Sequence, residues 1–203
     1  RLYNQVEYKL SPLDLLNKQH TVNDAVISGN GYNYGANIMV NKLTGKFTGW
    51  VAYSFGRALR QFDVYGNKWF PSNHERIHEL NVVASYKIND RIDIGGTFSY
   101  ATGTPYTRVE YMYLMNGNVL VEYGEHNSNR LKDYMRLDLS VNYDIIKKDS
   151  KVFGANLSFY SLNSLFRDNE MYYKVKVASD TFRFDSASYI TTTLPSVSLY
   201  YKF

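Results

Sequence analysis

The feature of this sequence that most constrains its fold is a strict alternation of apolar and polar residues that recurs along the chain. It is clearest in the last stretch, where every second residue is apolar: Val197, Leu199, Tyr201 and Phe203. Successive side chains of a β-strand leave opposite faces of a sheet, so a period of two indicates strands with one apolar and one polar face. A final strand that ends on an aromatic residue fits the wall of a transmembrane barrel better than a soluble sheet, because closure leaves no unpaired edge.

The same period predicts strands throughout the rest of the chain. They lie at residues 31–41, 47–56, 78–88, 92–101, 135–145 and 153–160, with a less regular extended segment at 1–9. Together with the last stretch they make about eight strands, separated by turn signals as in all-β proteins built from hairpins. We therefore predict an all-β, antiparallel fold.

The connections between the predicted strands alternate between short and long. The short ones lie at 43–46, 89–91 and 147–151, and the long ones at 10–28, 57–76, 102–133 and 163–187. Outer-membrane barrels have short turns on the periplasmic side and long loops outside. Because every short turn falls at the end of the sheet where the C-terminus must lie, we expect the long connections to face the exterior. A lipocalin-like soluble barrel could segregate its loops in the same way.

Composition narrows the classes of protein further. Tyrosine accounts for 20 of the 203 residues, and an aromatic fraction of 16% accompanies a hydrophobic fraction of only 44%. The tyrosine side chain, with an apolar body and a polar tip, suits membrane interfaces and also carbohydrate-binding sheets. The net charge of +4 comes from basic residues scattered among acidic ones without a basic run, which argues against nucleic-acid binding.

Three features that the sequence lacks exclude further kinds of structure or site. The absence of cysteine excludes disulfides and cysteine-based metal sites. No apolar run reaches the roughly 20 residues that a membrane helix needs. The sequence from Arg1 does not begin as a signal peptide, so we expect either a mature chain or a piece of a longer protein.

Several segments, in their order along the chain, resemble the late barrel of a TonB-dependent outer-membrane receptor of the Bacteroidetes type. The first is the stretch TGKFTGWVAYS at residues 44–54. The others lie at 60–62, 68–71, 74–80, 84–87, 100–103, 135–140 and 195–203. The resemblance covers most of the chain from about Gly31 onward, and it is carried by the order and spacing of these segments together.

The resemblance implies energised uptake of a nutrient ligand across the outer membrane of a Gram-negative bacterium. The family has a barrel of about twenty-two strands, which an N-terminal plug closes and a TonB box links to the periplasm. Residues 1–203 would be the C-terminal part of that barrel, without the plug and the earlier strands. The implied partners are outer-membrane lipids, the plug and remaining strands, the TonB complex through the N-terminal part, and a surface lipoprotein. Neither a cofactor nor enzymatic activity is implied, and the ligand stays open among siderophores, cobalamin-like cofactors, peptides and oligosaccharides.

The resemblance also assigns roles to residues at the end of the chain and on one strand face. The family's C-terminal aromatic residue is a signal for the barrel-assembly machinery, and it maps onto Phe203 with the three apolar residues in register before it: Val197, Leu199 and Tyr201. The polar face of the strand at 135–145 should look into the barrel interior, as a hydrated wall against the plug or as a ligand contact: Arg136, Asp138 and Asn142. Trp50 most simply packs against the plug or the interior wall.

The longest expected outer connection is rich in tyrosine. The tyrosines could stack on a sugar or siderophore, press on a surface lipoprotein, or pack against one another within the loop: Tyr106, Tyr111, Tyr113 and Tyr123.

One short motif points to a different chemistry. Residues 74–78 spell HERIH, which matches the H-E-x-x-H pattern of zinc proteases. That chemistry needs a helix, because strand positions four apart are separated by roughly 13 Å and cannot share one metal ion. Since His78 opens a predicted strand, we interpret the match as coincidental and expect no metal site and no catalytic residues.

Two alternatives to a receptor segment remain at this point. A complete barrel of about eight strands would be an anchor or adhesin, although small residues such as Gly49, Ala52, Gly56, Gly95 and Ala101 would fill its interior poorly. A soluble sugar-binding sheet is the third interpretation.

Overall fold

A computed structural model describes residues 1–8, 26–115, 118–148, 151–178 and 181–203. The predicted connection at 10–28 lies largely outside these residues, as do residues 149 and 150 of the predicted turn at 147–151. Within the described ranges the chain is all β apart from two short 3-10 helices, η2 (Asp63–Tyr65) and η3 (Leu162–Leu165). No helix in these ranges is both long enough and apolar enough to cross a membrane.

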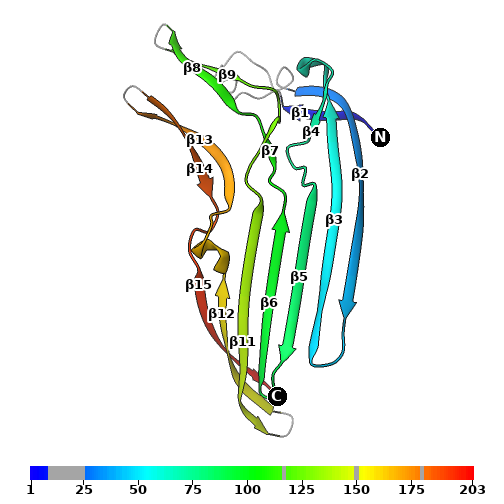
Figure 1. The fold of residues 1–203 in the computed structure, drawn as a ribbon, viewed down its shortest axis with the longest axis vertical. Helices are drawn as coiled ribbons and strands as arrows, with labels where there is room; N and C mark the ends of the chain where they lie inside the picture. Colours follow the sequence, from blue (N-terminus) through cyan, green and yellow to red (C-terminus); the bar gives the residue numbers. More distant parts are fainter. Residues whose placement is uncertain (9–25, 116–117, 149–150, 179–180) are drawn as a thin grey trace. The chain divides into compact units, whose positions relative to one another are not determined.

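One antiparallel sheet follows the order of the chain (Figure 1). Its strands are, from one end to the other, β1 (Leu2–Tyr8), β2 (Val26–Lys42), β3 (Phe47–Gln61), β5 (His78–Lys87), β6 (Ile92–Ala101), β11 (Tyr134–Lys148), β12 (Lys151–Tyr160) and β15 (Leu194–Lys202). All the strands expected from the alternation are confirmed. The predicted connection at 57–76 begins too early, because β3 continues to Gln61, where β4 (Trp69–Pro71) pairs with it.

Two of the long connections contain strands that the alternation did not predict. They contain three further pairs of strands: β7 (Pro105–Tyr106) with β10 (Asn129–Arg130), β8 (Val109–Met115) with β9 (Asn118–Tyr123), and β13 (Glu170–Ala178) with β14 (Thr181–Ser188). A sequence signal for one of these pairs exists, since Asn116-Gly117 is the dipeptide most typical of tight hairpins. With β4 and these three pairs, the described residues contain more strands than the expected number of about eight.

Contacts divide the chain into two compact units. Unit 1 comprises Arg1–Gly35, Gly56–Glu75 and Thr104–Arg130, and unit 2 comprises Ala36–Phe55, Arg76–Gly103 and Leu131–Phe203. In unit 1 the buried apolar residues form one small cluster of Ile27, Phe62 and Phe70, with Tyr65 packed against it.

The register of unit 2 sorts its side chains into two faces. Residues directly opposite each other in antiparallel strands share a face. One row across the sheet is entirely apolar: Phe47, Tyr86, Ile94, Val141, Leu157 and Val197. The adjacent row is made of small and hydroxyl-bearing residues: Thr48, Ser85, Gly95, Ser140, Ser158 and Ser196. The two faces predicted from the alternation are therefore continuous across six neighbouring strands.

The apolar face is exposed, whereas part of the polar face is buried. On the apolar face Tyr86 is 48%, Val141 37% and Val197 72% exposed. On the polar face Ser158 is only 4% exposed. Burial of apolar area normally drives folding in water, so an exposed apolar face of this extent indicates a surface that meets something other than water.

Polar side chains hold the other face together by hydrogen bonds. Asn142 donates to Asp93 and accepts from Asn156, both at 2.6 Å, and Ser158 donates to Asn156 at 2.6 Å. This chain of bonds crosses from β6 through β11 to β12, so the polar face supplies its own hydrogen-bond partners.

The short turns and the C-terminus lie at one end of unit 2 (Figure 1). The register pairs Lys87 with Asp93 and Lys148 with Lys151, and it places Lys202 opposite Val152. At the β5–β6 turn the Asn89 side chain accepts hydrogen bonds from the N–H groups of Arg91 at 2.8 Å and Ile92 at 2.9 Å. Such a side-chain turn explains why asparagine stands there.

Gly49 lies where the backbones of β3 and β5 approach each other closely. Its φ is +152°, and a Cβ atom there would lie 2.1 Å from the backbone oxygen of Val83. At Gly96, on the same face, the nearest atom would be the mobile Cδ2 of Leu139 at 3.1 Å. We expect Gly49→Ala to lower the free energy of unfolding by about 2 kcal/mol, because backbone must shift, and Gly96→Ala by less than about 1 kcal/mol. Urea unfolding of the folded protein measures both, and equal effects would contradict the register.

Candidate functional site

The polar face of unit 2 brings Arg136 and Asp138 together. Both oxygens of the Asp138 carboxylate lie 3.0 Å from Nε of Arg136, and the N–H of Ser161 donates to the same carboxylate at 2.7 Å. The two residues are two positions apart on β11, so their side chains leave the same face. The two charges neutralise each other, and their hydrogen bonds fix both side chains on the polar face of the sheet.

The other residues expected on this face are there, but at separate positions. Trp50 belongs to the row that continues through Val83 and Thr97 to Asp138, so it shares their face three strands away. Asn142 lies further along β11, where both of its amide atoms are engaged by Asp93 and Asn156. The structure thus gives Asn142 a bonding role within the sheet.

A cavity of about 350 Å³ lies on unit 2 around the start of β5 and β11. Its lining includes Arg76, Glu79, Asn81, Ser99, Tyr134 and Arg136. Pockets for small molecules have volumes from about 300 Å³ upward and combine apolar walls with a few placed polar groups. The end with the short turns has a second hollow of about 480 Å³, lined by charged side chains such as Lys87, Asp93, Asp144 and Lys147.

Two asparagines bond the edge of β11 beside the first cavity, and one of them, Asn169, lines it. β12 pairs with β11 only from Leu139 onward. Before that point Asn169 accepts from the N–H of Met135 at 2.9 Å and donates to its carbonyl at 2.6 Å, while Asn163 accepts from the N–H of Leu137 at 3.1 Å. These side-chain amides take the place of a neighbouring strand, because backbone groups without a partner would be costly.

Most of the tyrosines predicted as outer contacts lie on one hairpin of unit 1. Tyr111 is 64%, Tyr113 49% and Tyr123 39% exposed on β8 and β9. Tyr111 and Tyr113 are two positions apart and share a face of β8. Tyr106 is separate, in the short strand β7, where it pairs with Asn129.

The residues predicted as the barrel-assembly signal share the apolar face of β15. Val197 and Tyr201 lie opposite Leu157 and Phe153, and the rings of Tyr201 and Phe203 are 6.0 Å apart. All members of the set are exposed, with Phe203 at 93%. Their role in assembly stays a prediction.

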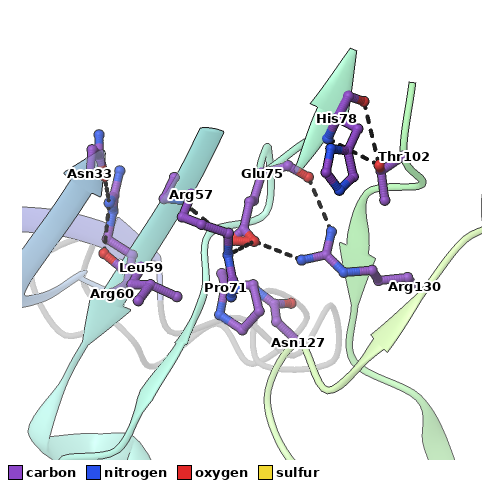
Figure 2. Close-up of polar contacts among 11 residues, drawn as sticks. Asn33, Arg57, Leu59, Arg60, Pro71, Glu75, His78, Thr102, Asn127 and Arg130 are labelled. Carbon is purple, nitrogen blue, oxygen red and sulfur yellow. Dashed lines mark hydrogen bonds and ion pairs between the residues drawn. The ribbon is translucent and has the colours of Figure 1, made fainter. Parts of the chain in front are cut away.

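Unit 1 contains a charge cluster that the sequence did not reveal. Glu75 is 2% exposed and lies between two guanidinium groups, 3.0 Å from Nε of Arg57 and 2.7 Å from Nη2 of Arg130 (Figure 2). The acidic residue of the HERIH stretch is therefore engaged by two cations. The prediction that His78 opens a strand is confirmed, and its Nδ1 lies 2.8 Å from the hydroxyl of Tyr53.

An aromatic cluster around His126 is the second feature of unit 1. The His126 ring stacks on Tyr65 at 4.1 Å and meets Phe70 edge to face at 4.7 Å. The neighbouring Asn127 donates to the carbonyl of Pro71 at 2.8 Å and thereby joins two connections. Burial lowers the pKa of His126, because the charged imidazolium would lose its hydration.

No known protein family, curated protein or solved structure matches this chain. Across the described ranges, no group of three or more His, Cys, Asp and Glu side chains is placed to hold a metal ion. What the geometry offers is a polar wall with a small cavity, backed by an apolar face. Such a surface is suited to binding and to lining an aqueous space.

Removal of the Glu75 carboxylate should destabilise unit 1. Glu75→Gln removes the negative charge that pairs with Arg57 and Arg130. We expect a loss of about 2–3 kcal/mol, reduced from the cost for a fully buried pair because the arginines are 31% and 25% exposed. Glu125→Gln is the control, since its ion pair with Lys68 is exposed on both sides and should change stability by at most about 0.5 kcal/mol. Trp69 fluorescence in a Trp50→Phe background reports unfolding of unit 1.

Acid should weaken unit 1 through His126. Since burial lowers the pKa of His126 below its ordinary value of 6.5, the unfolded chain takes up the proton first. The stability that the neutral ring contributes is complete above pH 6.5 and is lost as the pH falls through the lowered pKa. We expect this loss in urea unfolding followed by Trp69 fluorescence, and His126→Gln should remove it. An identical pH profile for the variant and the wild type would contradict the assignment.

Proposed function

We propose that the chain is a wall segment of a TonB-dependent outer-membrane receptor that takes up a nutrient ligand. The observation that carries the proposal is the continuous, exposed apolar face of unit 2, opposite a hydrogen-bonded polar face. In a transmembrane barrel the apolar face meets lipid and the polar face lines an aqueous interior.

The dimensions of the strands support this proposal. β5 and β6 contain 10 residues each. A tilted strand needs about 9–11 residues to cross the hydrocarbon core of a bilayer. The short turns at the end of unit 2 that holds the C-terminus also fit the periplasmic side of such a barrel, with the hairpin β13–β14 outside.

The order of the strands supports a barrel larger than this chain. The sheet of the described residues runs from β1 to β15 and is open at both ends. Open edges are not viable in lipid, because the hydrocarbon offers no hydrogen bonds to free N–H and C=O groups. Further strands would complete the wall, as in the barrel of about twenty-two strands that the segment resemblance implies. The alternative of a small complete barrel, an anchor or adhesin, requires β1 to pair with β15.

In this role the chain is not an enzyme. It supplies wall, outer hairpins and part of the ligand vestibule. The proposed partners are outer-membrane lipids, the plug with the remaining strands, the TonB complex acting through them, and a surface lipoprotein on the outer hairpins.

Lipid quenching tests which face meets the membrane. Trp50 lies on the polar face, and its neighbour Val51 lies on the apolar face opposite Val82. In a Trp69→Phe background, native Trp50 should keep its fluorescence in vesicles of brominated phosphatidylcholine. The tryptophan of Trp50→Phe/Val51→Trp should lose most of its fluorescence there. Equal quenching of the two, or a protein that does not enter vesicles, would contradict the proposal.

The intact mass of the native polypeptide from purified outer membranes separates the two barrel hypotheses. Several hundred residues before Arg1 would support the large receptor, whereas a chain beginning at Arg1 would favour the small barrel.

A further inference from the structure

The cavity at the start of β5 contains two opposite charges that do not neutralise each other. Arg76 and Glu79 both line it, and both belong to unit 2. Among the residues that the structure describes, neither side chain has an ion-pair partner within 4.0 Å. The other cation in the lining, Arg136, is neutralised by Asp138 at 2.9 Å.

Each of the two charges is positioned by its neighbours. The Arg76 guanidinium lies over the ring of Tyr134, with Cζ 5.9 Å from the ring centroid. The Glu79 carboxylate accepts a hydrogen bond from the side chain of Asn81 at 3.1 Å, which leaves its second oxygen for another donor. A cation over an aromatic face and a carboxylate held at one oxygen are pre-oriented, so less entropy is lost when a ligand binds.

The walls of the cavity are also well defined. Tyr189 meets Tyr134 edge to face at 6.1 Å, and its N–H donates to the carbonyl of Asn169 at 2.9 Å. Asn169 is 4% exposed, and its amide is bonded at both atoms to Met135. The cavity therefore has a fixed aromatic wall beside its two charges.

We propose that this cavity binds a small zwitterion, such as an amino acid or a short peptide, with its carboxylate at Arg76 and its ammonium at Glu79. Arg76 is exposed and Glu79 is half-buried, so each already contacts water. A ligand with both signs gives each side chain a charge-assisted contact in place of that water. A neutral sugar would leave both unmatched, and a simple anion would meet repulsion from Glu79. The inference rests on the proposed function only in requiring that this polar face be open to water.

Trialanine and its blocked forms test the proposal in detergent. Equilibrium dialysis with the folded protein compares trialanine, N-acetyl-trialanine and trialanine amide, with maltotriose as the neutral ligand. We expect trialanine to bind at least about tenfold more tightly than either blocked form, because each block removes one charge-assisted contact.

Two variants assign the contacts. Glu79→Gln should erase the preference for a free amino group but keep the preference for a free carboxylate, and Arg76→Gln should do the opposite. Lys68→Gln, which removes an exposed charge of unit 1, should change neither preference. Far-UV circular dichroism checks that each variant is folded.

Failure to bind trialanine, equal binding of its blocked forms, or tighter binding of maltotriose would overturn the proposal. Equal loss of both preferences in both variants would also overturn it. None of these outcomes alters the quenching of Trp50 and Val51→Trp by brominated lipid, so a failed ligand proposal is distinguishable from a failed membrane proposal.

Discussion

The register of the antiparallel ladder is the constraint on which the rest of unit 2 depends. Because opposite residues share a face, a slip of one position would move every apolar side chain onto the polar face. A slip of β3 by one position, for example, would place Phe47 on the polar face and Thr48 on the apolar face. Gly49 limits such a slip, because only glycine leaves room for the backbone oxygen of Val83. The amphipathic character of the wall is therefore a property of the pairing as much as of the composition.

The two units use polar groups in different ways. In unit 2 the bonds of Asn142 and Asn156 run between strands and stiffen a wall. In unit 1 the buried Glu75 and the aromatic ring of His126 gather connections that are distant in sequence. The register of the strands in unit 2 and the conformation of the connections in unit 1 are thus stabilised by separate sets of contacts.

Strands and faces were predictable because alternation is a local property of the chain. The position of β5, with Val82 and Val83 on opposite faces, follows from the sequence alone. The hairpin β8–β9 was missed, since its polar and aromatic residues were interpreted as a loop although Asn116-Gly117 marked a turn. The Glu75 cluster and the Arg76–Glu79 cavity were not predictable. Their partners come from distant segments, and only the tertiary fold shows which charges become paired and which do not.

The side-chain amides of Asn163 and Asn169 act as a joint between the wall and the hairpin that follows. They bond the backbone of β11 at Met135 and Leu137, where β12 no longer pairs with it, so strand pairing with β11 does not hold the chain that follows Asn169. The strands between Asn169 and β15, β13 and β14, pair with each other and not with the large sheet. The length and sequence of this hairpin can diverge while the sheet stays unchanged, so this surface can vary in evolution independently of the paired strands of that sheet.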